Sequence, residues 1–326
     1  MTFAKTPRRI AAALAAAMLT ASGTAQAQTY PDRPITLIIP FAPGGGTDVL
    51  ARILAPVLAP KLGGTIIIET VAGGAGNVGS QRLARSAPDG YTLLLHNVGF
   101  AINAALYKNL SFDSEKDLSA LSFVSDSPLV ILGRKTIPAE TLKDLVAWMK
   151  QNTAKLAHAG VGSASHMAIV PLARAAGQGD MVPYRGGGPA VQDVIGNHVD
   201  LTASPLQSAL GPATEGLAKA YAVTSAERSP ALPNVPSIAS ELGPKSVTTF
   251  WSLLLARAGT PQAITDKIIA ALEATLADRQ MKEAYVKNGL TLYPEATRKP
   301  AGAQVELARE IAHWREIVRD SNIEQP

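Results

Sequence analysis

Glycine-rich turns that join apolar runs to amphipathic runs are the part of this sequence best suited to bind a ligand. The stretch Pro40–Arg52, PFAPGGGTDVLAR, follows the apolar run Ile35–Ile39 and carries Thr47 and Asp48 where a helix should begin. A strand, a glycine turn and a helix start present unpaired N–H groups at the positive end of a helix dipole. The pattern predicts an anion cradle, for a nucleotide phosphate, a reacting group or another acid.

The same order of elements occurs twice along the chain. Three more glycine turns each follow an apolar run and precede a helical pattern, at 73–76, 160–165 and 186–188. Short apolar runs that alternate with helices predict an α/β fold with mainly parallel sheets. Ligands in such folds sit beyond the carboxyl ends of the strands, where these turns lie. We therefore expect two similar lobes and a shared cleft, in which helix N-termini hold an anion.

The glycine turns match known nucleotide-binding patterns only in part. The first turn lacks the Gly-Lys-Ser/Thr of a phosphate-binding loop. The stretch Gly74–Gly79 matches G-x-G-x-x-G between a strand and a helix, as a dinucleotide site requires. However, the next predicted strand ends in His96 and Asn97 rather than in an acid that would hold a ribose hydroxyl. Dinucleotide binding, and with it a redox function, is therefore a minor alternative, and we expect no cofactor.

Serines beside a histidine raise the possibility of a hydrolase. Ser163, Ser165 and His166 are close in sequence, but the frame G-x-S-x-G is absent. The alternative is a helix start in which Ser165 is the N-cap and His166 lies in the first turn, lining the cleft or packing. The five histidines show no metal-ligand spacing, so no metal is expected.

Arg185 is the charged residue best placed to bind an acid, because it precedes the turn at 186–188. Its guanidinium either clamps a carboxylate with two hydrogen bonds or is simply solvated at a strand end. Asp48 and Asp193 each fall in the first turn of a predicted helix. Acids at that position more often serve as caps or dipole partners than as catalytic groups.

The start of the chain predicts export. A basic beginning, a short apolar run and Ala25-Gln26-Ala27 fit a signal peptide cleaved near Ala27/Gln28. The sequence has 30 Lys+Arg and 26 Asp+Glu residues, and three of the basic ones precede residue 28. The remaining 27 basic and 26 acidic residues give no electrostatic case for nucleic acid. The chain has no cysteine, which excludes disulfides, thiol chemistry and a lipid anchor on cysteine.

Several longer stretches together resemble the Bug/TctC family of extracytoplasmic solute-binding proteins of tripartite tricarboxylate transporters. They occur in family order over nearly the whole mature chain and include YPDRPITLIIPFAPGGGTDVLAR, APDGYTLLL, GVGSASH, VPYRGGGPAVQDVIGNHVDL and FWSLLLARAGTP. The resemblance implies a two-lobed periplasmic-binding-protein fold, type II-like, that closes on a small carboxylate and performs no chemistry. It also implies a two-subunit membrane transporter component as partner. We expect a signal peptide at 1–27, one domain at 28–125 plus 240–326, a second at 126–239, and a monomer.

The resemblance also implies the residues of the binding site. Family members hold one carboxylate through backbone amides and waters near the first glycine turn. Carried over by motif, the expected ligand-binding residues of the first lobe are Phe41, Gly45, Gly46, Thr47, Asp48 and Asn97. Those of the second lobe are Gly162, Ser163, Ser165, His166, Tyr184, Arg185, Gly186 and Ser204.

The residue at position 204 departs from the family pattern and bears on the ligand. Family members often carry an acid where Ser204 stands. If that acid meets an amino group, its absence favours a dicarboxylate or an aromatic acid over an amino acid. Two further functions stay open on sequence alone, an exported hydrolase using Ser165 and His166 and a ligand-sensing partner of a signalling receptor.

Overall fold

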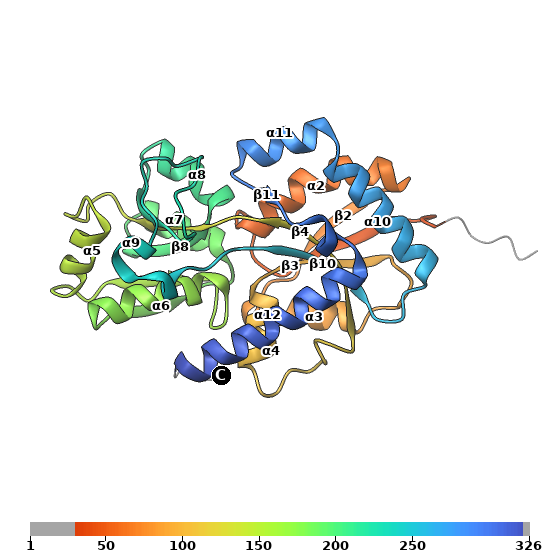
Figure 1. The fold of residues 1–326 in the computed structure, drawn as a ribbon, viewed down its shortest axis with the longest axis horizontal. Coiled ribbons are helices and arrows are strands. Elements are labelled where there is room, and N and C mark those ends of the chain that lie inside the picture. The colour runs from red at the N-terminus through yellow and green to blue at the C-terminus, as the bar shows by residue number, and fades with distance from the viewer. Residues whose placement is uncertain (1–29, 322–326) are drawn as a thin grey trace, which may run out of the picture.

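The computed structural model describes residues 30–321 and divides them between two α/β lobes joined by two crossing segments (Figure 1). The predicted signal peptide and its cleavage site lie outside the described residues. The first lobe contains a six-stranded sheet in the order β11-β4-β10-β3-β1-β2, and the second a five-stranded sheet in the order β7-β6-β8-β5-β9. The lobe limits expected from sequence, 125/126 and 239/240, stay predictions.

The first lobe is built from an N-terminal block and a C-terminal block. Its strands are β1 (Ile35–Ile39), β2 (Ile66–Thr70), β3 (Thr92–Asn97), β4 (Leu118–Asp126), β10 (Ser252–Arg257) and β11 (Thr291–Leu292). Its helices are α2 (Gly46–Leu62), α3 (Asn77–Ala84), α4 (Gly99–Leu106), α10 (Gln262–Leu276), α11 (Arg279–Lys287) and α12 (Pro300–Ser321). Helices α2 and α10 pack together over one face of the sheet, and α12 packs on α4 and β4 over the other.

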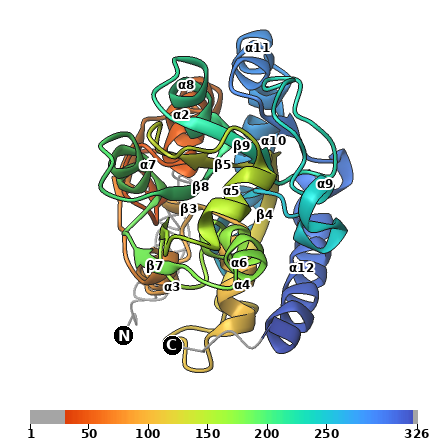
Figure 2. The same cartoon turned by 90° about the vertical axis from the view of Figure 1, so that its left-hand side faces the viewer.

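The second lobe comes from the middle of the chain. Its strands are β5 (Leu129–Gly133), β6 (Lys155–His158), β7 (Asp180–Pro183), β8 (Leu201–Pro205) and β9 (Lys219–Val223). Its helices are α5 (Leu142–Met149), α6 (Ala164–Ala176), α7 (Gly187–Ile195), α8 (Leu206–Thr214) and the short α9 (Ala239–Leu242). Figure 2 shows α7 and α8 on one side of this sheet and α5 and α6 on the other.

The repeat inferred from sequence is a repeat of topology. In each sheet one strand, β1 or β6, pairs in parallel with the strands on both sides of it, and the three form a parallel trio. The strand beside this trio, β10 or β5, runs antiparallel to both of its neighbours. Each antiparallel strand begins just after the chain has crossed from the other lobe, which explains its reversed direction. The sheets are therefore mixed, not mainly parallel as the alternation of elements had indicated.

Two segments side by side form the connection between the lobes. The chain leaves the first lobe through Ser127 and Pro128, and it returns through Thr249 and Phe250. Pro128 and Thr249 form an antiparallel bridge, and the Phe250 N–H donates to the Ser127 carbonyl over 2.7 Å. A pair of short extended segments is the kind of hinge that can absorb a rotation of one lobe against the other.

Candidate functional site

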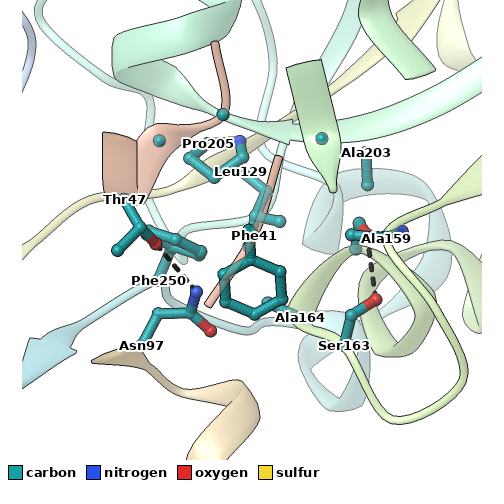
Figure 3. A pocket seen from close by; sticks show the side chains of 14 residues that line it. Phe41, Thr47, Asn97, Leu129, Ala159, Ser163, Ala164, Ala203, Pro205 and Phe250 are labelled. Atoms are coloured by element: carbon teal, nitrogen blue, oxygen red, sulfur yellow. Dashed lines mark hydrogen bonds between the residues drawn. The ribbon is translucent and has the colours of Figure 1, made fainter. Parts of the chain in front are cut away.

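A cavity lies between the two lobes at the carboxyl ends of the parallel strands (Figure 3). Its empty volume, including the mouth, is about 370 Å³. The residues that line it are Phe41, Gly45, Gly46, Thr47, Asn97, Leu129, Ala159, Ser163, Ala164, Ser165, Gly187, Ala203, Pro205 and Phe250.

On the side of the first lobe, the start of α2 faces the cavity. The helix begins at Gly46 and its N-cap residue is Gly45, which has no side chain to occupy the first N–H groups. Helix geometry leaves these N–H groups without partners inside the helix. The Thr47 hydroxyl accepts a hydrogen bond of 2.9 Å from the Asn97 side-chain amide, at the end of β3. The expected contributions of Gly45, Gly46, Thr47 and Asn97 thus meet at one place.

Asp48 is next to the cavity in sequence, but its carboxylate serves the turn. One carboxylate oxygen accepts from the Gly44 N–H at 2.9 Å, and Arg52 donates to the same oxygen at 3.0 Å. Asp48 is 4% exposed and is absent from the cavity lining. It therefore braces the glycine turn and, as an anion in the first turn of α2, interacts favourably with the helix dipole.

On the side of the second lobe, the start of α6 faces the cavity. Ser163 is the N-cap, because its hydroxyl accepts from the His166 N–H at 3.2 Å. The expectation that Ser165 caps this helix is wrong: its hydroxyl instead accepts from the Ala159 N–H at 2.8 Å. Ser163 has extended backbone angles, as an N-cap requires, whereas Ser165 already lies within the helix. Both serines line the cavity.

His166 lies behind this helix start and outside the cavity lining. Its Nδ1 accepts from the Gly162 N–H at 3.3 Å, and its ring packs against His158 with centroids 4.7 Å apart. Burial, followed by the neighbouring His158, lowers the pKa of His166 to about 4. The imidazole is therefore neutral at pH 7 and its Nδ1 is used by a backbone amide. This arrangement does not supply the serine–histidine hydrogen bond on which a hydrolase depends.

The third helix start, that of α7, contributes Gly187 to the cavity. Three preceding residues that were predicted for the site, Tyr184, Arg185 and Gly186, do not line the cavity. The Tyr184 hydroxyl donates to Asp193 at 2.5 Å, and burial together with this bond raises the pKa of Tyr184 to about 12. The side chain of Arg185 is exposed and is not among the residues that line the cavity, so a carboxylate clamp by Arg185 stays a prediction. Gly186 is the N-cap of α7.

Ser204 also lies beside the cavity without lining it. Its hydroxyl is 2.9 Å from that of Ser208, while its neighbours Ala203 and Pro205 are the residues that face the cavity. Leu129 and Phe250 were missed by sequence reasoning. Leu129 begins β5 directly after one crossing segment, and Phe250 belongs to the other. The only sequence signal for these segments was the pair of expected domain limits, at 125/126 and 239/240.

The turn that matches the dinucleotide pattern has a packing role. The ring of His96 lies against Gly76, where an added Cβ would come within 2.4 Å of Nε2. Burial lowers the pKa of His96 to about 4, and its Nε2 has no hydrogen-bond partner within residues 30–321. His96 in turn contacts Phe41, with ring centroids 5.5 Å apart. This turn thus supports Phe41 from behind, and three of the four predicted helix starts reach the cavity.

The electrostatics of the cavity come from the backbone. Among the described residues, none of those that line it carries an ionisable side chain. Three helices, α2, α6 and α7, direct their N-termini towards it, and each provides partial positive charge and free N–H donors. The cavity is also lined by apolar side chains, those of Phe41, Leu129, Ala203, Pro205 and Phe250. The site can therefore hold a small anion with an apolar body.

The described residues contain neither a candidate metal centre nor a candidate membrane-spanning helix. Over residues 30–321 no group of three or more His, Cys, Asp or Glu side chains is arranged to hold a metal ion. In the same part of the chain, no helix combines the length and the apolar character needed to cross a membrane.

Two α/β lobes, paired crossing segments and a cavity between facing helix N-termini define a solute-binding protein of the two-lobed periplasmic class. Comparison with known families agrees. The model of the tripartite tricarboxylate transporter family receptor, TctC, matches residues 50–323, and the chain belongs to this family. The family consists of solute-binding proteins rather than enzymes, which confirms the expectation that the chain is not an enzyme.

Individual relatives cover almost the whole chain. The protein BugT of Bordetella pertussis is 34% identical over 301 residues, covering 90% of this chain and 91% of BugT. The structure of the periplasmic binding protein BugD superposes with a TM-score of 0.88 at 34% identity, covering 91% of this chain and all of BugD. MatC of Rhodopseudomonas palustris, solved with bound malate, superposes with a TM-score of 0.84 at 31% identity, covering 89% of this chain and all of MatC. A second protein of that organism, solved with adipate, superposes with a TM-score of 0.83 at 26% identity, covering 89% of this chain and 97% of that protein.

Proposed function

We propose that this protein captures a small organic carboxylate in the periplasm and delivers it to a tripartite tricarboxylate-type membrane transporter. The observation that carries the proposal is the convergence of three helix N-termini, from both lobes, on one interlobe cavity without a charged side chain. A carboxylate satisfies the free N–H donors of such a site and interacts favourably with the helix dipoles. A cation would meet only their repulsion.

Within this class, a dicarboxylate or aromatic acid suits the site better than an amino acid. An ammonium group requires acceptors, and the described lining residues include no Asp or Glu. The Asn97 side-chain oxygen is already used by the Gly99 N–H at 2.9 Å. Phe41 and Phe250 offer an apolar surface to the body of the acid. Two relatives of this chain were solved with dicarboxylates, malate and adipate, which supports the same choice.

The remaining parts of the proposal concern export, partners and movement. We propose that the chain is exported after cleavage near Ala27, acts as a monomer and is recognised by a two-subunit membrane component. The lobes close on the acid by rotation about Ser127–Pro128 and Thr249–Phe250. Binding drives closure only because the closed form offers donors from both lobes at once, and so has the higher affinity.

Calorimetry with a panel of acids at pH 7.5 tests the ligand class. We expect at least one of succinate, malate, adipate or benzoate to bind, and the uncharged amide of the same acid not to bind. Aspartate and glutamate should bind more weakly than the matching acids without the amino group. Tight binding of aspartate or glutamate, with no response to the plain acids, would show that the ligand class is wrong. Failure of every carboxylate would show that the site does not hold this anion.

A further inference from the structure

The two glycine triplets, Gly44–Gly46 of the first lobe and Gly186–Gly188 of the second, touch each other backbone to backbone. The Ala42 N–H donates across the interface to the Arg185 carbonyl over 3.0 Å. Side chains placed between these segments would keep the backbones apart. The close contact between the lobes, and not ligand binding alone, therefore favours glycine in both triplets.

Gly186 and Gly188 are crowded by the opposite lobe. A Cβ built on Gly188 would lie 2.0 Å from the Pro43 carbonyl oxygen, and one on Gly186 would lie 2.6 Å from the Ala42 nitrogen. Both distances are well below a normal contact, and the atoms approached are backbone atoms that cannot rotate away. Either methyl group would thus collide with the first lobe in this arrangement of the lobes.

Neither position needs glycine for its own backbone conformation. Gly186 has a φ of 162°, which is extended backbone open to any residue. Gly188 is the second residue of α7 and is not among the glycines with positive φ. Within the second lobe alone, alanine would be acceptable at both positions, and in a helix it is generally more stable than glycine. Only the contact between the lobes requires glycine here.

Glycines of the first lobe are likewise in close contact with the second lobe. A Cβ on Gly46 would lie 2.6 Å from the Pro205 side chain, which belongs to the second lobe. The α-carbon of Gly188 is 3.6 Å from the position of a Cβ on Gly44. The two triplets thus meet over a short distance at the rim of the cavity, next to the lining residues Gly45 and Gly187.

We propose that the two glycine triplets form an interlocking stop that fixes how far the lobes close and thereby limits the size of the acid that the closed cavity accepts. This inference rests on the proposed function, because it assumes a ligand that the closed lobes enclose. It assigns Gly186 and Gly188 a role in affinity and size selection without contact with the ligand. A methyl group at either position holds the lobes apart at the rim.

The variant Gly188→Ala tests the stop, with Gly211→Ala as a matched control. Gly211 lies in α8, and a Cβ there has its nearest neighbour at 3.9 Å, from the flexible end of Glu215. Because the chain has no cysteine, the pair Pro56→Cys and Gln192→Cys allows specific spin labelling of exposed sites on α2 and α7. Pulsed electron paramagnetic resonance then gives the distance between the two labels, one on each lobe. Calorimetry with the acid panel gives the affinity for each acid.

With the preferred acid, the unmodified protein and Gly211→Ala should reach the same short interlobe distance. Gly188→Ala should stop at a longer distance and bind that acid about tenfold to a hundredfold more weakly, the range expected for overpacking a tight contact. Its relative affinity for longer acids should rise. The unfolding temperature of ligand-free Gly188→Ala should be equal to or higher than that of the unmodified protein. This control separates blocked closure from misfolding.

Equal closure and affinity in Gly188→Ala and the unmodified protein would overturn the inference, as would a lack of any closure in the unmodified protein. If the panel shows that an amino acid is the ligand, the proposed ligand class fails, whereas the stop is still tested with that amino acid. The two failures are therefore distinguishable.

Discussion

The substitution Asn97→Asp tests whether a site without charged side chains is what selects an anion. The Asn97 side chain lines the cavity, is 3% exposed, donates to Thr47 at 2.9 Å and accepts from the Gly99 N–H at 2.9 Å. A carboxylate of the same shape keeps both contacts, since the Thr47 hydroxyl can act as donor in place of acceptor. The change therefore adds a negative charge and leaves the geometry in place.

The size of the effect follows from the charge. Two unit charges about 5 Å apart repel by roughly 3 kcal/mol at an effective dielectric constant of about 20. This lowers the affinity for a carboxylate roughly 200-fold. Burial raises the pKa of the new carboxyl, so protonation on acidification should restore binding while the ligand is still ionised.

Calorimetry of the acid that binds best, repeated between pH 8 and pH 5.5, measures both effects. Thermal unfolding of the ligand-free variant serves as the control for folding. We expect a large loss of affinity at pH 8 that shrinks towards pH 5.5, in a protein that remains folded. Unchanged affinity at pH 8 would refute the reasoning, because it would place the ligand's charge away from Asn97 and the start of α2.

Three further outcomes follow from the structure. Tyr107→Phe removes the hydrogen bond of 2.9 Å that joins the lobes through the Val161 carbonyl, so calorimetry should show affinity reduced about twofold to tenfold. Asp48→Ala should lower the unfolding free energy by about 1 kcal/mol more than Asp48→Asn, which keeps an acceptor for the Gly44 N–H; denaturant titration measures this. Burial raises the pKa of Asp126 to about 6, so the native state holds its proton more strongly than the unfolded state. The unmodified protein should thus lose about 1–3 kcal/mol of stability relative to Asp126→Asn as pH rises from 4 to 7; equal pH profiles would contradict this.

The repeated glycine turns were informative from sequence because they combine three local signals: an apolar strand, residues that permit a tight turn, and a helical period. Such signals depend on neighbours in sequence, and they located the starts of α2, α6 and α7 to within a few residues. They also predicted two equivalent lobes. The carboxyl ends of parallel strands then bring the turns together, whatever the details of packing.

Side-chain direction was beyond the reach of the same signals. Asp48 and Arg185 both flank glycine turns, yet one bonds to its own turn and the other is exposed. Ser163 and Ser165 are equally good caps by residue type, and the choice depends on which of them has extended backbone angles. Leu129 and Phe250 reach the cavity only because two distant segments pair at the hinge. Each of these outcomes depends on tertiary contacts that sequence spacing does not encode.

The central claim is that backbone N–H groups at three helix starts hold a carboxylate. Amide chemical shifts of isotope-labelled protein, followed during titration with the acid that binds best, test it most directly. We expect the largest changes at the amides that begin the three helices, namely Gly46, Thr47, Ala164, Ser165 and Gly187. Changes should be small at Asn77, where α3 begins away from the cavity. Large changes at Asn77, with none at the other five, would contradict it.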